Sequence, residues 1–543
     1  MLRRMRPDPP EQLHDVRAYL TRLGNVRCPA GLIEGCRAGL FRSRLLRNVV
    51  VMWTRRQFVT IGAVAGFGVA SSGCARGERP SATGSSPTLV TSVDGRVPDV
   101  TARYTASPMQ WSIAGNEVTT WGYNSQLPGT LLRATAGDLV EVTIDNQLPQ
   151  ATSFHWHGLA IRSEMNGVPG VAQPDIETGT QFTYKFVVPD PGTYWFHPHH
   201  GLQLERGLYA PLIIDDPDEH VRSDVEYVIV LDDWLDGTGT TPDGEYERIR
   251  AAGLEMGDMS GGDHSMMDMA SSPLLGGDAG DARHPYHMVN GRPLEDPATL
   301  EPLPRAGDRV RLRFINASAD TAYRVAVGGH RLTVTHTDGF PIEPIDVDAL
   351  LIGMGERYDV TFVVTSGAWP IVALAEGKDQ RAGAIMRTAD TKTGNVVQFD
   401  AAELDGSWLR YADLAAHERA RLDPPDELVE IDVSLTGGMM MTDWGIDGNK
   451  YGDHIPINLE EGQWYSLNIT NDTTMWHPIH IHGHTPQLGR APGGVRKDTV
   501  NVLPGLTTEF VFRADNPGQW MLHCHNAYHL EAGMATLLSY GGK

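Results

Sequence analysis

Cysteine is scarce in this chain, and so is positive charge. Only four cysteines occur among 543 residues, and Cys524 is the only one in the expected folded body. The sequence therefore offers no disulfide framework and leaves one thiolate free for a metal. The formal net charge is −23, which argues against nucleic acid or an anionic membrane surface as a partner. The apolar run at residues 59–70 is too short to span a bilayer as a stable helix.

The segment at residues 523–534 concentrates side chains that bind copper. Cys524 stands between His523 and His525, and His529 and Met534 follow. A blue-copper site needs two imidazoles, a thiolate and a weak axial thioether, so Cys524, His529 and Met534 supply three of its four ligands. Successive strand residues point to opposite faces, so His523 and His525 should face a second metal site. The segment thus predicts two copper centres joined through one cysteine.

The first 94 residues have the composition of a leader. Residues 1–51 are basic and irregular, and Met52 offers a second start, so we expect 1–51 to be an over-extended N-terminus; a real cytoplasmic extension is the alternative. An arginine pair before the apolar run predicts a twin-arginine signal peptide, and a tether completes residues 52–94. We expect export to the periplasm, cell envelope or exterior, either as a free chain or as a lipoprotein anchored at Cys74.

An internal repeat indicates the domain organisation. Three times, a glycine and an asparagine nine residues apart bracket alternating apolar residues, at 137–146, 307–316 and 462–471. Each copy predicts a turn leading into a half-buried strand. Together with 59 glycines and 35 prolines, the repeat favours an all-β chain of three β-sandwiches. The expected domains are 95–220, 221–424 including a linker, and 425–543.

Paired histidines follow the first and third copies of the repeat. Each His-x-His pair places two imidazoles on one face of a strand. Val325 and Val327 stand at this place in the second copy, so the middle domain is expected to be a spacer without copper ligands. Eight imidazoles suit three coppers, and His477 then completes the blue site beside Cys524. The four pairs are His155 and His157, His197 and His199, His480 and His482, and His523 and His525.

These motifs resemble the four signatures of the multicopper oxidases, and the resemblance covers residues 100–540. It implies three cupredoxin-like Greek-key β-sandwich domains and an oxidoreductase with four coppers. Substrate would be oxidised one electron at a time at a type 1 copper, and dioxygen reduced to water at a trinuclear cluster between the first and third domains. The resemblance assigns His477, Cys524, His529 and Met534 to type 1; His155 and His480 to type 2; and, for the type 3 pair, His157, His197 and His525 to one ion and His199, His482 and His523 to the other.

Oxygen reduction consumes protons, so a carboxylate is expected near the cluster. Many members of the family have an aspartate nine residues after the second histidine of the first motif, where this chain has Asn166. Glu164 or Asp498 could serve instead, and the proton route is left open. Electrons would pass from Cys524 along the backbone to His523 and His525.

Methionines indicate the substrate. Thioether sulfur favours Cu(I). The methionine-rich segment at residues 256–269 of the expected middle domain is otherwise rich in Gly, Ser and Asp, so its methionines have no packing role there. Met475 matches a methionine that bacterial cuprous oxidases place beside the blue copper; their nearby aspartate is Thr473 here, with Asp472 adjacent. We therefore expect a cuprous oxidase for copper detoxification. The candidate Cu(I) contacts are Met475, Asp472, Met256, Met259, Met266, Met267 and Met269.

Other functions fit parts of the sequence. A laccase would act mainly on phenols, and a ferroxidase would prefer Fe(II) to Cu(I). A periplasmic copper store, which is not an enzyme, would bind copper without consuming dioxygen. The chain length and the third repeat exclude a two-domain nitrite reductase. We expect a monomer that meets a membrane only through a lipid on Cys74.

Overall fold

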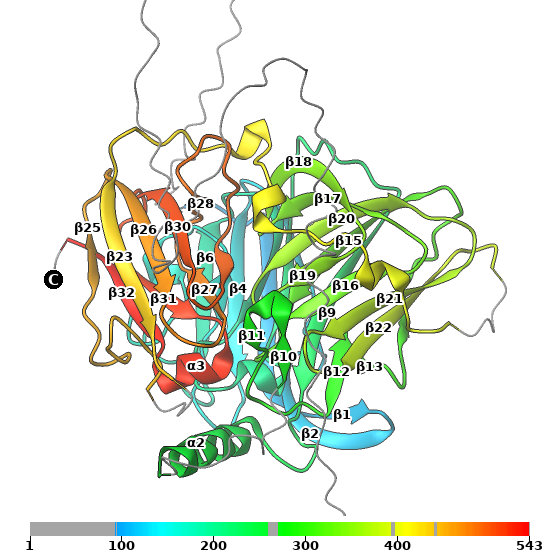
Figure 1. Ribbon diagram of the computed structural model, residues 1–543, viewed down its shortest axis with the longest axis horizontal. Helices are drawn as coiled ribbons and strands as arrows, with labels where there is room; N and C mark the ends of the chain where they lie inside the picture. The colour runs from blue at the N-terminus through cyan, green and yellow to red at the C-terminus, as the bar shows by residue number, and fades with distance from the viewer. Residues whose placement is uncertain (1–92, 94, 259–269, 392–396, 439–442, 542–543) are drawn as a thin grey trace, which may run out of the picture. The chain divides into compact units, whose positions relative to one another are not determined.

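The computed structural model describes residues 93, 95–258, 270–391, 397–438 and 443–541, which lie in one compact unit, Pro80–Lys543 (Figure 1). The expected leader at 1–51 and the signal peptide and tether at 52–92 fall outside the described residues. Within the described part, no helix is both long and apolar enough to cross a membrane. The described chain consists mainly of strands, which confirms the all-β expectation.

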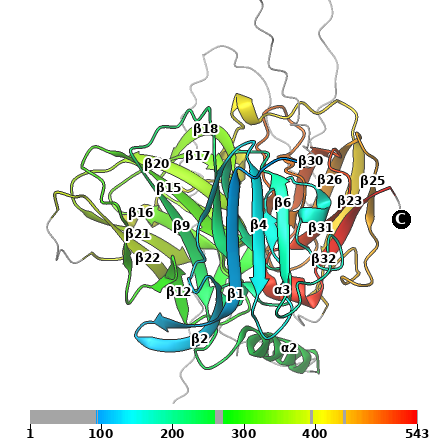
Figure 2. The same ribbon diagram turned by 180° about the vertical axis from the view of Figure 1, so that it is seen from behind.

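Six sheets form three successive pairs, one pair for each copy of the repeat. The first pair has the orders β2-β1-β4-β6 and β3-β8-β7-β5. Figure 2 shows β1, β4 and β6 side by side. The strands of this first pair are β1 (Val100–Ile113), β2 (Asn116–Tyr123), β3 (Leu132–Thr135), β4 (Leu139–Asn146), β5 (His155–His157), β6 (Gln181–Val187), β7 (Gly192–His197) and β8 (Ala210–Asp215).

The second pair of sheets is the largest, with orders β13-β12-β9-β15-β20-β17-β18 and β14-β22-β21-β16-β19. Its strands are β9 (Val225–Trp234), β12 (Tyr286–Val289), β13 (Arg292–Pro293), β14 (Ala298–Thr299), β15 (Arg309–Asn316), β16 (Tyr323–Val327), β17 (Leu332–Thr337), β18 (Phe340–Val347), β19 (Leu350–Ile352), β20 (Arg357–Val363), β21 (Ala368–Ala375) and β22 (Gln380–Arg387). Val325 and Val327 of β16 are fully buried in the apolar core between these sheets.

The third pair has the orders β24-β23-β26-β30-β28 and β25-β32-β31-β27-β29. Its strands are β23 (Val429–Thr436), β24 (Gly445–Ile446), β25 (Ile457–Leu459), β26 (Trp464–Asn471), β27 (His477–Ile481), β28 (Gln487–Leu488), β29 (Thr499–Val502), β30 (Thr507–Arg513), β31 (Gln519–Cys524) and β32 (Ala535–Tyr540). Below, the three pairs of sheets are called the first, middle and third domains.

The sequence repeat marks the same strand in each domain. β4, β15 and β26 each pair in parallel with the first strand of their domain and antiparallel with β6, β20 or β30. The glycine that opens each copy has a φ between +86° and +96°, a turn conformation that costs glycine little. The repeat is therefore a shared piece of topology.

The asparagine that ends each copy explains the other half of the pattern. Asn146, Asn316 and Asn471 are fully buried. Each side-chain amide donates to two later backbone carbonyl groups, one 4–5 residues ahead and one 30–36 residues ahead, and each side-chain oxygen accepts from the backbone amide two residues ahead. One buried side chain thus pairs with three backbone groups that would otherwise lack hydrogen-bond partners in the interior.

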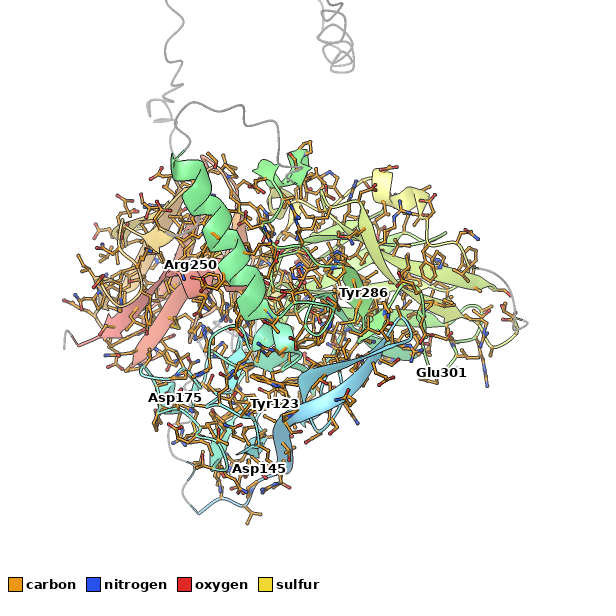
Figure 3. The ribbon with its side chains drawn as sticks, turned by 90° about the horizontal axis from the view of Figure 1, so that it is seen from below. Tyr123, Asp145, Asp175, Arg250, Tyr286 and Glu301 are labelled. Atoms are coloured by element: carbon orange, nitrogen blue, oxygen red, sulfur yellow. The ribbon has the colours of Figure 1, made fainter. Side chains whose placement is uncertain are left out.

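Few helical elements occur in the described part, and two of them matter for function. Helix α3 (Ala527–Ala532) follows β31 directly and lies close to the small hairpin of β10 (Ser271–Ser272) and β11 (Gly277–Asp278) in Figure 1. Helix α2 (Pro242–Asp258) runs across the face seen in Figure 3, where Arg250 is labelled on it. The chain after α2 returns as residues 270–281, and Leu275 and Ala279 are buried in the core of the third domain. The middle domain thus reaches onto the third.

Candidate copper centres

The only described cysteine lies at the centre of the first candidate site. Cys524 ends β31 and is fully buried. Its Sγ lies 3.6 Å from Nδ1 of His477 and 3.5 Å from Nδ1 of His529, and these two nitrogens are 3.0 Å apart. The three atoms can contact a single ion. Met534 is also fully buried, in the same core cluster as Cys524.

Both imidazoles of this site are held by their outer nitrogens. Nε2 of His477 lies 2.8 Å from the Thr473 hydroxyl, and Nε2 of His529 lies 3.2 Å from a carboxylate oxygen of Asp281. Each ring therefore keeps Nδ1 for the thiolate side, which is the arrangement that second-sphere hydrogen bonds give to metal-binding histidines. Trp444 packs against both rings, with centroids 5.1 and 4.5 Å away, and shields them.

The second candidate site collects all eight histidines of the paired motifs. β5 and β7 bring two pairs from the first domain, and β27 and β31 bring two from the third. His155 stacks on His482 with ring centroids 3.9 Å apart, and His157 stacks on His480 at 3.8 Å, so the two domains interlock ring against ring. Four overlapping sets of three could each hold an ion: His155, His199 and His482; His155, His157 and His480; His157, His197 and His525; and His480, His482 and His523.

The orphaned nitrogens of these rings show that the site fits metal ions. His155, His197 and His480 each direct Nδ1 to a backbone carbonyl oxygen 2.8–3.1 Å away. The Nε2 atoms of these three rings and of His199 are buried without any hydrogen-bond partner, and both ring nitrogens of His525 are as well. A buried polar atom without a partner is costly, and a metal ion would use these lone pairs.

Burial also keeps the cluster in the form that binds metal. It lowers the pKa of His155, His157, His199, His482, His523 and His525 well below the usual range for histidine, and neighbouring imidazoles lower each further. Burial lowers the pKa of His197 to about 3. Neutral imidazole is the ligand form, so these rings need not release protons to bind copper at neutral pH.

A buried carboxylate joins the three domains beside this cluster. Asp498 of the third domain accepts two hydrogen bonds from Arg357 of the middle domain, both 2.7 Å long. It also contacts Nε2 of His157 in the first domain at 3.2 Å, which leaves Nδ1 of His157 for a metal. Burial alone would raise the pKa of Asp498, but Arg357 and the hydrogen bonds hold it well below the usual range. Asp498 therefore lies where it orients His157, and its lowered pKa favours the ionised carboxylate.

The other proton-route candidate lies elsewhere. Glu164 is exposed, with 60% of its side chain accessible, and pairs with Arg162 at 3.5 Å. No contact with a cluster histidine is seen for it, because the short helix η1 (Ser163–Met165) turns it outward. Asn166 is instead part of the site: its backbone oxygen binds His155, and its side-chain oxygen lies 2.9 Å from Nδ1 of His482. The asparagine thus orients rings from both domains.

One cavity of about 350 Å³ reaches the cluster from outside. Its wall includes His197, His199, His523 and His525 and residues of α3. Glu531 is the one carboxylic acid among the described lining residues, and burial raises its pKa. Dioxygen and water could reach the histidines by this route.

Sequence reasoning missed the carboxylates beside the first site. Asp281, which touches His529, and Asp278, which forms a β-bridge with Met475, both come from the middle domain. Burial, reinforced by Asp281, raises the pKa of Asp278 to about 7. The signal was present in the sequence, since both aspartates follow closely on the methionine-rich segment.

The predicted Cu(I) contacts have mixed outcomes. Met475 is buried two residues before His477. Asp472 is exposed and accepts a hydrogen bond from Ser434, so it faces away from this site. Met259, Met266, Met267 and Met269 lie outside the described residues, as does the side chain of Met256 in α2.

Comparisons with known proteins agree along the chain. Three family models, each described as multicopper oxidase, match residues 105–219, 226–393 and 424–541. Multicopper oxidase MmcO of Mycobacterium tuberculosis is 43% identical over 500 residues, covering 90% of this chain and 97% of that protein. Copper resistance protein A of Pseudomonas syringae pv. tomato is 28% identical, covering 78% and 90%.

The solved structures agree with the sheet arrangement. A laccase from Botrytis aclada superposes with a TM-score of 0.66 at 25% identity, covering 81% of this chain and 88% of the laccase. The expected three cupredoxin-like β-sandwiches and the expected oxidoreductase are confirmed. The chain belongs to the multicopper oxidase family, whose copper chemistry its two histidine-rich sites suit.

Proposed function

We propose that this enzyme is a cuprous oxidase that carries four coppers and uses dioxygen to convert Cu(I) into Cu(II). His477, Cys524, His529 and Met534 would hold the type 1 copper. His155 and His480 would hold the type 2 copper. His157, His197 and His525, and His199, His482 and His523, would hold the type 3 pair. The last three rings are mutual neighbours, with centroids 4.9–5.1 Å apart.

When bound, the coppers would supply one-electron redox couples and a dioxygen-binding centre, so that four Cu(I), one O₂ and four protons give four Cu(II) and two waters. Cys524 provides a covalent path between the two sites, since its backbone neighbours His523 and His525 belong to the cluster. Asp498 and Asn166 hold the cluster rings in place, and Arg357 keeps Asp498 ionised.

The substrate proposal rests on two carboxylates, Asp278 and Asp281, and on the thioether of Met475, which lie beside the first candidate site. Asp281 binds the outer nitrogen of the His529 ring, and Asp278 adjoins Met475. Carboxylates attract a cation and thioether sulfur favours Cu(I). Ala270, the first described residue after the methionine-rich segment, packs on the third-domain core that contains Met475. The resemblance to copper resistance protein A supports the same reading.

Oxygen uptake with Cu(I) or a phenol as electron donor tests the proposal. The experiment compares the intact protein with Met475→Leu and with a deletion of residues 259–269. We expect both variants to lose about tenfold in kcat/KM for Cu(I), about 1.4 kcal/mol of transition-state stabilisation, while phenol turnover persists. Met386→Leu, in the middle-domain core, is the matched control and should change neither. Absence of Cu(I)-dependent oxygen uptake above the uncatalysed rate would refute the cuprous oxidase proposal.

Fe(II) is the second candidate substrate, because Asp278 and Asp281 offer the oxygen ligands that it also accepts. A ferroxidase would show a higher kcat/KM for Fe(II) than for Cu(I), with little effect of Met475→Leu. Steady-state kinetics with both ions under the same buffer conditions separates the two functions.

We also propose that the chain is exported through a twin-arginine signal beginning near Met52. The support is the arginine pair before the short apolar run at 59–70. Replacing Arg55 and Arg56 together by lysine should leave the oxidase in the cytoplasm. Mass spectrometry of the exported protein would decide whether Cys74 carries a lipid.

A further inference from the structure

Helix α3 connects two ligands of the proposed type 1 site, and the middle domain holds the start of this helix. Asn526 is its N-cap, and its side-chain oxygen accepts from the backbone amides of Tyr528 and His529 at 3.0 and 3.2 Å. The same side chain donates from Nδ2 to Asp320 of the middle domain at 2.6 Å, inside the protein. A second bond crosses the same boundary, from the Ala527 amide to the Ala319 oxygen at 2.9 Å.

Asp320 is held as firmly as the residue it binds. Lys378 donates to its carboxylate at 2.8 Å and also to its backbone oxygen at 3.0 Å. Asp233 accepts from the backbone amides of Ala319 and Asp320 at 2.7 and 3.1 Å, which fixes the loop itself. Asp320 is fully buried, so its contact with Asn526 is part of the interior and is not screened by solvent.

The grip on Asn526 bears on the positions of Cys524 and His529. Asn526 is separated from Cys524 by one residue, and it caps the helix that carries His529, accepting from the backbone amide of His529 at 3.2 Å. Contacts that orient the ligands of a metal tune the metal centre, including its potential. A displaced Asn526 would therefore change the positions of Cys524 and His529 relative to each other.

We propose that Asp320 is a positioning residue for the type 1 centre, which it sets by fixing Asn526 between Cys524 and helix α3. This inference rests on the proposed type 1 site. The middle domain, expected to be a spacer, has no ligand set among its described residues, yet Asp320 reaches Cys524 through Asn526 and Asp281 reaches His529 directly. A domain without ligands thus helps to set the site where electrons are taken up.

Three variants of the full-length, copper-loaded protein test the proposal. Asn526→Ser can still cap α3 but is too short to reach Asp320. The double variant Asp320→Ala with Lys378→Met removes the acceptor without leaving a buried unpaired ammonium. Asp320→Asn, also combined with Lys378→Met, is the matched control, because its amide oxygen can still accept from Asn526 and no buried ammonium is left unpaired. Each is assayed for copper content, for the visible thiolate-to-copper absorption and for the type 1 reduction potential by redox titration.

We expect Asn526→Ser and the Asp320→Ala double variant to keep their copper but to show a changed potential and a shifted absorption band, with the Asp320→Asn control close to the wild type. Unchanged potential and absorption in both altered variants would overturn the proposal. A shift in the Asp320→Asn control as large as in the Asp320→Ala variant would also overturn it, because loss of charge and not of the hydrogen bond would then be responsible. A wild-type protein without the thiolate absorption would instead refute the type 1 assignment under the proposed function.

Discussion

Replacement of Asp498 by asparagine tests whether this residue holds the three domains together, because all three meet at its side chain. Asp498 is fully buried and meets Arg357 from the middle domain and His157 from the first. Asparagine keeps the volume, but its amide offers a donor where Arg357 also offers one. Arg357 would then rely on two backbone oxygens, each 3.1 Å away, and on Asp338 at 3.7 Å.

The protein should lose stability, because the charge of Arg357 would be left without a carboxylate at hydrogen-bond distance. Breaking a buried ion pair from one side costs about 3–5 kcal/mol. An unfolding entropy of about 2.1 cal/mol/K per residue, taken over roughly 450 residues, gives a Tm shift of about 1 °C per kcal/mol. We therefore expect the copper-free variant to melt about 3–5 °C below the wild type by calorimetry. Copper content should also fall, because His157 loses the carboxylate that selects its metal-binding nitrogen.

Asp359→Asn is the control, since Asp359 is a comparably buried carboxylate bound to Arg311 and Arg313 and touches no cluster histidine in the structure. It should destabilise the protein without changing copper content. The acid side provides a second readout. The pKa of Asp498 is depressed in the folded protein, so its stabilisation is present above the ordinary carboxyl range and is lost as the pH falls through the lowered pKa. A Tm change below about 1 °C with full copper content in Asp498→Asn would refute the reasoning.

Further outcomes follow from other contacts. Gly355→Ala should lower the free energy of unfolding by about 2–5 kcal/mol and perturb the type 3 copper signals, because a Cβ would lie 3.0 Å from both His157 and His525 at a φ of +84°. Gly307→Ala is the control for backbone strain alone, because its φ is +96° and a Cβ there would meet open space. Equal effects of the two substitutions would contradict the predicted contact with the histidines. Cys524→Ser should abolish the visible thiolate absorption and the oxidase activity, and retained colour would disprove the type 1 assignment. The rate of Cu(I) oxidation should rise between pH 6 and 8 as Asp278 ionises, because burial raises its pKa to about 7. A pH–rate profile that is unaltered in Asp278→Asn would exclude this role. The raised pKa also means that the contribution of Asp278 to stability is lost as the pH rises through 7.

The fold was predictable because its three domains repeat one local pattern. Spacing alone showed the glycine turn and the alternating strand, and the paired histidines distinguished the two outer copies. The buried role of Asn146, Asn316 and Asn471 could not be read from spacing, because each side chain also binds a carbonyl group 30–36 residues further along the chain, which it meets only in the folded domain.

Contacts between domains were the part that the sequence could not supply. Asp281, Asp320 and Arg357 contact His529, Asn526 and Asp498, each more than a hundred residues away. Local patterns carry no information about such distances, so the middle domain was expected to be only a spacer. Glu164 was proposed on proximity in sequence to the first motif, and a short helix turns it to solvent.

The two stacked imidazole pairs have a consequence for how the enzyme is assembled. His155 stacks on His482 and His157 on His480, and three of the four candidate sets in the cluster combine two histidines of the first domain with one of the third. Neither outer domain alone can form the complete cluster, so docking of the first domain onto the third has to precede loading of these three sets. Copper bound across this boundary would then clamp the two domains together, and part of its binding energy would become stability of the assembled chain. Copper supply would therefore act as the last step of maturation as well as the source of the cofactor.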